Sequence, residues 1–497
     1  MSTFFPQDSQ LFSKISAAAG QPVYLVGGAV RDAMLGRPSN DLDFVLSKDA
    51  RVVGKKVANL LGGGFYMLDE ARETARVIID VDGRKQYLDF ATFRGADLEA
   101  DLRDRDFTLN AMALDVDTNR LIDPTGGAAD LRLRQLRPAS ARSLVSDPVR
   151  VMRAIRLSLA LNLHILPETA EAMRAAVALL ARVSPERKRD ELFRMLDGSR
   201  VDTALRLLDR FGILPDVLPE LEALKGVRQS APHVYDVWEH TLAVLHHLEA
   251  LFAVLVARSV PTDTDRSANI HASTVLLFLR QHREKFREHY DTSVNPNRTP
   301  RALVFLAALY HDISKPQART VEDSGRVRFF EHEHFGASVM QERARALALS
   351  SAEVQRAVAI VKHHMRVHHL AAGPLPPTRR AVYRFFKATG AAGPDVALLS
   401  LADVMATYGV TLPQQVLENE LTAVRTLLDG LWEAPQEVVR PPRLLSGQDL
   451  QEQFQLSPGR EIGDLLEDLQ EAQAMGDVSS RDDALRFIEQ RLKQDQK

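Results

Sequence analysis

Two aspartates that follow a glycine pair are the residues in this sequence most suited to chemistry. Gly27 and Gly28 come directly after the apolar run 22–26, where a glycine backbone can approach a phosphate closely and present N–H groups at a helix start. Asp41 and Asp43 stand two residues apart at the start of a second apolar run, so both carboxylates are expected on one face of a strand. Paired oxygen ligands suit Mg²⁺ shared with nucleotide phosphates. Two such ions about 4 Å apart could activate a 3′-hydroxyl and stabilise a leaving pyrophosphate.

The plainer interpretation of Asp41 and Asp43 is a turn residue followed by a solvent-facing strand residue, but the glycine pair upstream favours a metal site. Asp89, in the run Tyr-Leu-Asp-Phe, is a third strand carboxylate, which either completes that metal site as a catalytic residue or faces solvent. Arg94 at the end of that run is equally compatible with a triphosphate contact and with an ordinary surface position.

Several motifs in this part of the chain resemble those of one enzyme family, the class II CCA-adding enzymes and bacterial poly(A) polymerases. Residues 23–43 are similar to the family's signature, and residues 105–113 (Arg-Asp-Phe-Thr-Leu-Asn-Ala-Met-Ala) resemble its second motif, RRDFTxNAxA. Asp123-Pro, Gly126-Gly127 and Asp130-Leu131 are similar to its third motif. One position departs from the family: its first arginine in the second motif is Asp104 here, which removes one expected phosphate contact.

The resemblance assigns roles to individual residues. It implies that Asp41 and Asp43 hold Mg²⁺ and that Gly27, Gly28 and Arg31 lie at the nucleotide-phosphate end. It implies that Arg105, Asp106 and Asn110 surround the ribose and phosphates of the incoming nucleotide. From the residues alone, Arg105 and Asp106 could also form a surface ion pair worth about 0–1 kcal/mol.

A base-selection motif follows, which the family writes EDxxR. The stretch Ser146-Asp-Pro-Val-Arg150 resembles it, with Ser146 in place of the glutamate, and Arg153 continues the same helix. A carboxylate accepts from an exocyclic amine and a guanidinium donates to ring acceptors, so Asp147, Arg150 and Arg153 would recognise C and A. Alternatively, Asp147 caps a helix whose first residue is Pro148. In the next motif, residues 184–192, Arg187 and Arg189 could brace the site, contact RNA or be solvated charges.

The short stretch 93–105 bears on the product. Family members that complete CCA usually carry a flexible loop at this point, and the stretch leaves almost no room for one. The resemblance therefore implies an enzyme that adds only the two cytidines, and complete CCA addition stays open.

A second set of metal-binding residues occurs between residues 228 and 437. Because the chain has no cysteine, a metal must be held by Asp, Glu or His. His311-Asp312-Ile-Ser-Lys resembles the motif of HD phosphohydrolase domains, which are found fused to this family. The resemblance implies that a divalent metal of undecided identity is bound, with the following candidate ligands: His240, His311, Asp312, His332, Asp403 and one of His363 and His364.

The hydrophobic patterns predict an α+β chain with a small mixed-sheet head followed by helices. Strand and helix signals mix over residues 1–135, which form the predicted nucleotidyltransferase head, with Asp82-Gly83 as a hairpin turn. After about residue 147 the period is helical. We expect a helical neck over 136–227 with base-selection and RNA-binding motifs, an HD domain over 228–437 and a helical tail over 438–497. Residues 260–301 look like an irregular polar insertion, and 438–442 like a linker.

Charge and composition limit the partners. The net charge of −3 argues against a general nucleic-acid binder, yet seven arginines stand against one acid between Arg132 and Arg156, which suits local contact with RNA. No apolar run approaches a membrane span and no secretion signal is visible, so we expect a cytoplasmic protein. The expected partners are the tRNA 3′ end, CTP and ATP, with no membrane and no obligate protein partner. The rival hypotheses are a poly(A) polymerase, an HD phosphohydrolase with an inactive head, and a non-enzymatic RNA-binding module.

Overall fold

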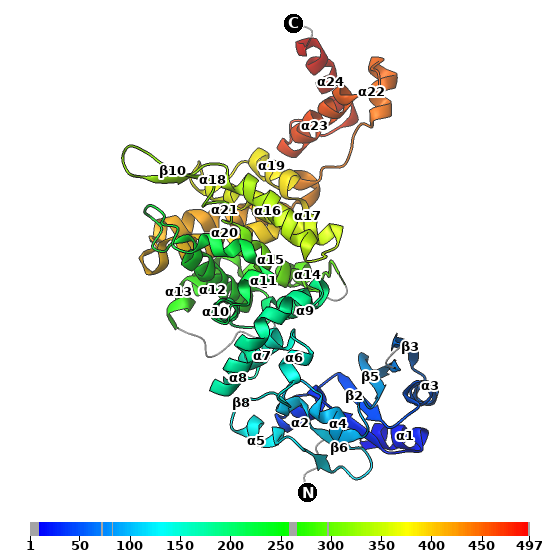
Figure 1. Cartoon of the computed structure of the whole chain (residues 1–497). Coiled ribbons are helices and arrows are strands. Elements are labelled where there is room, and N and C mark those ends of the chain that lie inside the picture. Colours follow the sequence, from blue (N-terminus) through cyan, green and yellow to red (C-terminus); the bar gives the residue numbers. More distant parts are fainter. Residues whose placement is uncertain (1–8, 71–72, 82, 258–265, 296–297, 496–497) are drawn as a thin grey trace. The chain divides into compact units, whose positions relative to one another are not determined.

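The computed structural model describes residues 9–70, 73–81, 83–257, 266–295 and 298–495. The chain forms two compact units (Figure 1). We call Met1–Arg187 with Arg210–Ile213 the head unit, and Lys188–Asp209 with Leu214–Lys497 the helical unit. Among the described helices, none is long and apolar enough to cross a membrane.

The head unit is built on a seven-stranded sheet with the order β3-β4-β5-β2-β1-β6-β7. β2 and β5 are parallel, whereas the other neighbouring strands are antiparallel, so the mixed sheet predicted from the sequence is confirmed. The strands are β1 (Val23–Val26), β2 (Asp41–Leu46), β3 (Gly64–Asp69), β4 (Thr74–Val81), β5 (Arg84–Thr92), β6 (Ala113–Asp115) and β7 (Leu121–Ile122). The hairpin predicted around Asp82-Gly83 joins β4 to β5, with Asp82 outside the described residues.

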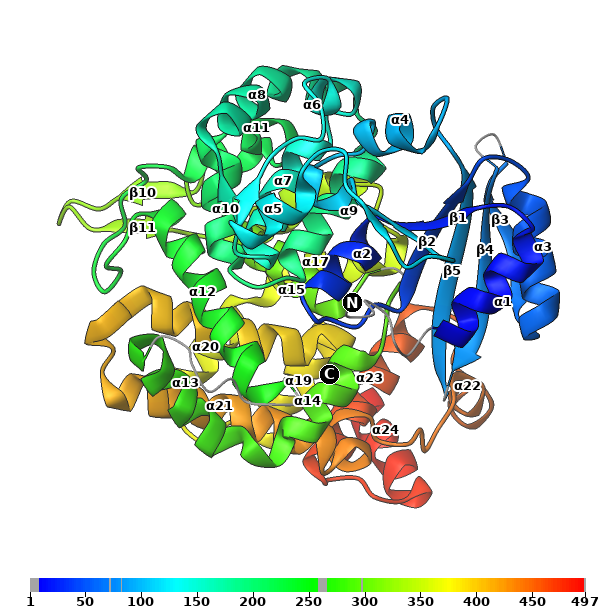
Figure 2. The ribbon, with the colours of Figure 1, turned by 90° about the horizontal axis from the view of Figure 1, so that it is seen from below.

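Exposed and buried residues alternate at the start of β2, and the buried ones anchor the sheet in the core. Leu42 and Phe44 point into the core, where Phe44 stacks on Phe90 of β5, and α1 and α3 close that core from the same side (Figure 2). The remaining elements of the head unit are α1 (Ser9–Ala19), α2 (Gly28–Met34), α3 (Ala50–Leu61), α4 (Leu98–Arg103), η1 (Thr108–Asn110), α5 (Gly127–Arg132), β8 (Gln135–Leu136), α6 (Ser143–Ser146), α7 (Arg150–Ala160), β9 (His164–Ile165), α8 (Pro167–Val177) and η2 (Ala178–Arg182). α9 (Pro185–Leu196) and α10 (Val201–Arg210) belong to both units.

The helical unit is almost entirely α-helical, with one small hairpin formed by β10 (Arg319–Val321) and β11 (Val327–Phe329). Its core is made of the apolar faces of long helices such as α12, α15 and α20, which contact one another. The helices are α11 (Leu214–Val217), η3 (Pro219–Leu224), α12 (Val237–Leu255), α13 (Arg266–Leu279), η4 (Arg280–His282), α14 (Arg283–Asp291), α15 (Pro300–Tyr310), α16 (His332–Ala346), α17 (Ser351–His363), α18 (Met365–Ala371), α19 (Arg379–Thr389), η5 (Gly390–Ala392), α20 (Gly393–Tyr408), η6 (Gly409–Thr411), α21 (Gln414–Trp432), η7 (Pro435–Val439), α22 (Gly447–Phe454), α23 (Arg460–Met475) and α24 (Arg481–Asp495).

Two sequence-based expectations about this unit need correction. The described part of residues 260–301 is not irregular, because α13 and α14 lie there, and Phe286 and Tyr290 of α14 are buried at helical spacing. The expected linker 438–442 begins inside the π-helical turn η7, where Val438 and Val439 are buried. Residues 258–265 and 296–297 of the expected insertion lie outside the described residues.

Candidate active site and metal centre

The start of β2 and the adjacent strand β5 bring three carboxylates to one face of the head sheet. Asp41 and Asp43 are exposed on the face opposite Leu42 and Phe44. Asp89 of the parallel strand β5 is in register with Asp43. Because partners in register on adjacent strands share a face, Asp89 stands beside Asp43. Desolvation by the surrounding protein, and then the negative charge of Asp89, raise the pKa of Asp43, although its side chain still reaches solvent.

Asp89 is engaged by a residue that sequence reasoning missed. Arg76 of β4 donates from Nε to Oδ1 of Asp89 at 2.7 Å and from Nη2 to Oδ2 at 2.6 Å. The signal was present in the hairpin, because Arg76 is opposite Asp89 in the β4–β5 register. In this structure Asp89 is therefore an ion-pair partner, which distinguishes it from the two carboxylates of β2.

Gly27 connects the carboxylates to the arginine of the second motif. Its φ of 74° lies in the region that glycine tolerates, and it precedes the first turn of α2. A Cβ at Gly27 would lie 3.1 Å from Nη1 of Arg105 and 3.7 Å from Oδ2 of Asp43. The glycine bend, a metal-ligand candidate and a cation thus meet at one point, beside the N-terminus of α2, which can bind anions.

The other candidate nucleotide-binding residues form one polar chain. Nη1 of Arg31 donates to Oδ1 of Asn110 at 2.6 Å, and Nδ2 of Asn110 donates to Oδ1 of Asp106 at 3.1 Å. Arg153 forms an ion pair with the other oxygen of Asp106 at 2.7 Å. Gly28 lies beside Arg31, where a Cβ would be 3.5 Å from Nη2. The structure therefore brings together residues from α2, η1 and α7 that lie up to about 120 positions apart in the chain.

Asp147 does not cap a helix, which corrects one of the two alternatives for this residue. α7 begins at Arg150, preceded by Val149 without a side-chain cap, and Asp147 instead forms an ion pair with Nη2 of Arg187 at 2.7 Å. The Oδ1 atom of Asp147 is buried and has no hydrogen bond within the described residues. An acceptor of this kind remains available for a base amine.

Arg150 and Arg189 are held inward. The Arg150 guanidinium donates to the carbonyl oxygens of Asp104, Arg105 and Ser143 at 2.9–3.1 Å. These bonds brace the second motif and engage both terminal nitrogens of the guanidinium. Within the helical unit, Arg189 donates to the carbonyl oxygen of Ala348 at 2.8 Å. Neither placement presents the guanidinium to a nucleotide or to RNA, in contrast to the exposed Arg187.

The stretch 93–105, where the sequence leaves no room for a flexible loop, is held by hydrogen bonds and an ion pair. Asp97 caps α4 by accepting from the Ala100 N–H at 2.8 Å. The buried Asp101 accepts from the Arg94 N–H at 3.0 Å and pairs with Arg105 at 3.1 Å. Arg94 therefore contributes its backbone here, and Asp101 fixes the side chain of Arg105.

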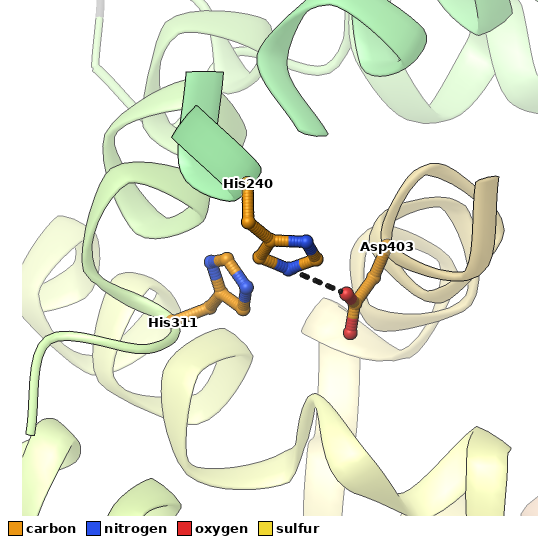
Figure 3. A group of neighbouring side chains, drawn as sticks. All are labelled: His240, His311 and Asp403. Carbon is orange, nitrogen blue, oxygen red and sulfur yellow. Dashed lines mark ion pairs between the residues drawn. The ribbon is translucent and has the colours of Figure 1, made fainter. Parts of the chain in front are cut away.

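In the helical unit, five elements bring most of the predicted metal ligands to one buried cluster. Figure 3 shows three of them, His240, His311 and Asp403. His240 of α12 lies with Nε2 3.0 Å from Oδ1 of Asp403 on α20. Asp312, directly after α15, is central: its oxygens lie 3.2 Å from Nε2 of His311 and 3.2 Å from Nε2 of His332. Two groups could each hold an ion, one formed by His240, His311 and Asp403 and the other by Asp312, His332 and His364.

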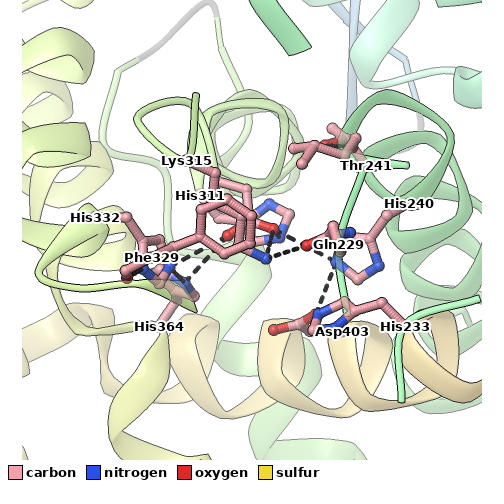
Figure 4. A network of polar contacts seen from close by, with 12 residues as sticks. Gln229, His233, His240, Thr241, His311, Lys315, Phe329, His332, His364 and Asp403 are labelled. Atoms are coloured by element: carbon pink, nitrogen blue, oxygen red, sulfur yellow. Dashed lines mark hydrogen bonds and ion pairs between the residues drawn. The ribbon is translucent and has the colours of Figure 1, made fainter. Parts of the chain in front are cut away.

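The tautomers of three histidines suit metal binding. Nδ1 of His311, His332 and His364 each lies 2.7–2.8 Å from the carbonyl oxygen three residues earlier, and a carbonyl can only accept, so each Nδ1 carries a proton. The other ring nitrogen, Nε2, of each histidine faces the cluster, as in metal-binding histidines. Nε2 of His332 and of His364 are 3.3 Å apart, an arrangement that a cation between them would relieve (Figure 4).

Electrostatics also fits a divalent cation. Burial lowers the pKa of His240, and burial together with His311 and His332 lowers that of His364, which keeps both rings neutral. Burial opposes ionisation of Asp403, but hydrogen bonds from His240 and His368 hold its pKa well below the ordinary value. Neutral imidazoles with ionised carboxylates form a donor set for a divalent metal.

His363 is not part of this cluster, whereas the adjacent His364 is. The chain leaves α17 at His363, so His364 points into the cluster while His363 lies among Lys362, Arg366 and His334 outside it. Desolvation and these cations lower the pKa of His363 to about 4.

Sequence reasoning missed the groups that support the ligands. His368 joins Asp403 at 2.9 Å to Glu420 at 3.0 Å, and Lys315 lies 2.6 Å from Asp312 and donates to Gln229 at 2.7 Å. The four-residue spacing of His364 and His368 was a sequence signal for His368, whereas nothing in the sequence pointed to Glu420. A cavity of about 590 Å³ opens onto this cluster, lined by Arg326 and Phe329 of the hairpin and by Tyr408.

A carboxylate pair beside a glycine bend and an arginine on a mixed sheet defines a metal-dependent nucleotidyltransferase head, and the helical unit adds a second metal-binding domain. Similarity to known proteins agrees. Residues 23–137 match the family model described as the poly A polymerase head domain, 162–225 the probable RNA and SrmB-binding site of polymerase A, and 269–408 the HD domain. The HD match contains His311, Asp312, His332, His364 and Asp403 but begins after His240.

The relatives give the family. The chain is 34% identical to the A-adding tRNA nucleotidyltransferase of Deinococcus radiodurans, over 94% of each chain. It is 32% identical to the CC-adding tRNA nucleotidyltransferase of Thermus thermophilus, over 93% of this chain and 92% of the relative. The chain belongs to the tRNA nucleotidyltransferase family. The same fold is found in a CCA-adding enzyme in complex with CTP (TM-score 0.59, 20% identity, 97% and 94% of the two chains) and in the Thermotoga maritima CCA-adding enzyme complexed with tRNA (TM-score 0.53, 20% identity, 97% and 94%).

Proposed function

We propose that the head unit transfers CMP or AMP from CTP or ATP to the 3′ end of tRNA and releases pyrophosphate. The meeting of Asp43, Arg105 and the Gly27 bend carries the proposal, because a triphosphate needs a metal ligand, a cation and a close backbone at one point. The relatives named as A-adding and CC-adding tRNA nucleotidyltransferases support tRNA as the acceptor. A tRNA substrate favours the cytoplasm as the location.

Each residue then has a part in the reaction. Asp41 and Asp43 would hold Mg²⁺, which when bound supplies positive charge for the phosphates and the attacking 3′-hydroxyl. Arg105 and the N-terminus of α2 at Gly28 would bind the triphosphate, with Arg105 kept in place by Asp101. Asn110 and Asp106, oriented by Arg31 and Arg153, would position the ribose. Asp147 would accept from the amine of C or A, with Arg187 beside it, and Arg150 would act as a brace.

The stretch 93–105 suggests which nucleotides are added. The stretch 93–105 is occupied by α4 and its cap, so it offers no flexible loop of the kind that accompanies complete CCA addition. We therefore propose addition of the two cytidines, with addition of A alone as the alternative favoured by the D. radiodurans relative. We also keep the division into head (1–135), neck (136–227), HD domain (228–437) and tail (438–497) as a proposal.

The test uses the whole purified chain with tRNAs that end before CCA, in CC, or in CCA, and with labelled CTP and ATP supplied separately. Two labelled cytidines on the first tRNA, and no AMP on the second, are expected. AMP on the CC end alone would make the protein an A-adding enzyme, and long A-tracts on unrelated RNA would make it a poly(A) polymerase. No incorporation on any acceptor would refute the transferase.

A second candidate activity, phosphoester hydrolysis, is supported by the HD cluster. His240, His311, Asp312, His332, His364 and Asp403 would bind divalent metal, which when bound supplies the acidity that turns water into a nucleophile. Lys315 and Arg326 would bind the phosphate in the cavity, beside Phe329. The experiment is hydrolysis of nucleoside 2′,3′-cyclic phosphates and terminal phosphates with Mg²⁺, Mn²⁺, Ni²⁺ or Co²⁺. Activity that persists in His311→Ala would refute the assignment.

A further inference from the structure

A basic groove on the helical unit lies outside both sites described above. It has a volume of about 510 Å³ and is lined by residues of α16, α17, α18 and α19. α18 separates it from the metal cavity: Arg366, His369 and Leu370 face the groove, whereas His368, Ala371 and Ala372 line the cavity. Met365 borders both spaces. The groove is therefore a neighbour of the metal cluster with a chemistry of its own.

The charge of the groove is strongly one-sided. Four cationic side chains line it against one carboxylate, that of Glu333, and three histidines lie among them. The cations are Lys362, Arg366, Arg380 and Arg384. Lys362 and Arg366 form no ion pair with any described residue, so their charges are not neutralised within the described part of the chain. Positive charge gathered in a concave space attracts anions more strongly than the same charge on a flat surface.

The two arginines of α19 are already oriented. Arg384 donates from Nε and Nη2 to the two oxygens of Glu471 on α23, both at 2.8 Å, and Arg380 lies 2.8 Å from the same residue. One carboxylate thus fixes two guanidiniums, which leaves net positive charge. The groove also includes Thr378, the cap of the eleven-residue helix α19, whose N-terminal N–H groups add partial positive charge.

We propose that this groove binds the phosphate backbone of RNA. Two of its cations, Lys362 and Arg366, have no ion-pair partner among the described residues, and its volume of about 510 Å³ is larger than one phosphate group needs. Sequence-independent contacts of this kind supply much of the affinity of proteins for nucleic acids. The inference rests on the proposed function to the extent that tRNA is the RNA concerned.

The test measures tRNA binding by the full chain, without nucleotide, over a range of salt concentrations. Lys362→Glu, Arg366→Gln and the double variant are compared with Lys285→Glu, a control on α14 whose lysine is similarly exposed. Removing a phosphate contact should lower the slope of log Kd against log salt by about 1, and the double variant by about 2, with roughly five-fold weaker binding per substitution at low salt. A thermal melt shows whether each variant is folded. If Arg366→Gln is unfolded, Lys362→Glu alone carries the test, because Lys362 lies on the surface.

Unchanged affinity and slope in the double variant would overturn the proposal. So would weaker binding of ATP with unchanged binding of tRNA, because the groove would then be a nucleotide site. Failure of the proposed function is distinguishable: it would appear as absent incorporation by the wild-type chain, whereas this assay involves no nucleotide transfer. If transfer is active, the variants should raise the KM for tRNA and leave kcat unchanged.

Discussion

At the scale of the residue, the two adjacent histidines provide a matched pair. His364 lies in the metal cluster and His363 lies outside it. His364→Ala should lose bound metal, because one imidazole of a three-residue group is removed. His363→Ala should keep the metal content of the wild type. The measurement is elemental analysis of the purified, dialysed proteins, and equal metal loss in both variants, or in neither, would contradict the assignment.

The choice between them shows where sequence reasoning ends. The resemblance to HD domains implied that His311-Asp312 and one of the pair bind metal, but a helix break between α17 and α18 decides which ring points inward. The same limit applies to Asp147, for which capping was an open alternative. The helix begins two residues later than that alternative requires, and Asp147 pairs with the distant Arg187. Long-range ion pairs of this kind, such as the pair of Arg76 with Asp89, cannot be predicted from the local sequence pattern.

At the scale of the element, Arg150 joins α7 to the loop that carries the second motif. Its guanidinium donates to the carbonyl groups of Asp104, Arg105 and Ser143. Arg150→Ala should lower the free energy of unfolding by roughly 3 kcal/mol, because those acceptors lose a charged donor. Urea denaturation followed by circular dichroism provides the value. If Arg150 instead read the base, the variant would keep its stability and lose only discrimination between nucleotides.

A buried ion pair holds three helices of the helical unit together and predicts acid sensitivity. Asp395 of α20 contacts His289 of α14 at 2.8 Å and Arg356 of α17 at 2.7 Å. Burial opposes its ionisation, but His289 and Arg356 hold the pKa of Asp395 below the ordinary value. A carboxyl group with a lowered pKa stabilises the fold fully above its unfolded pKa of about 4 and loses that contribution as pH falls through the folded value.

Asp395→Asn tests this argument. The variant should be less stable than the wild type at pH 7, and the difference should shrink as the pH falls below about 4 and the wild-type carboxyl is protonated. Urea midpoints measured as the pH falls give the comparison, with Asp323→Asn, an exposed position between β10 and β11, as the control. A difference that stays constant with pH would show that the ion pair does not contribute as described.

The elements themselves were predictable to different degrees. The strands of the head, the change to helical period and the HD motif all have strong local signals, and the structure confirms the mixed sheet and the helices. The helices in residues 260–301 were missed because α14 is highly polar, with the buried pair Phe286 and Tyr290 as its main apolar signal. Burial by neighbouring helices, rather than the segment's own composition, stabilises α14.

At the scale of the whole molecule, the chain carries two candidate chemical centres, each within one unit. The carboxylates of the transferase belong to the head unit, whereas the metal ligands of the HD cluster all belong to the helical unit. The basic groove is also within the helical unit. Substitutions in one centre should therefore leave the chemistry of the other intact.

We propose that Asp43 holds the metal for nucleotidyl transfer. The most direct test is incorporation of labelled CMP into a tRNA lacking CCA by wild type, Asp43→Asn and His311→Ala. Asp43→Asn should reduce kcat/KM by at least about a thousand-fold, since the paired carboxylates act together on the metal, while tRNA affinity and HD metal content are retained. His311→Ala should incorporate CMP as the wild type does. Incorporation by Asp43→Asn within about ten-fold of the wild type would contradict the account.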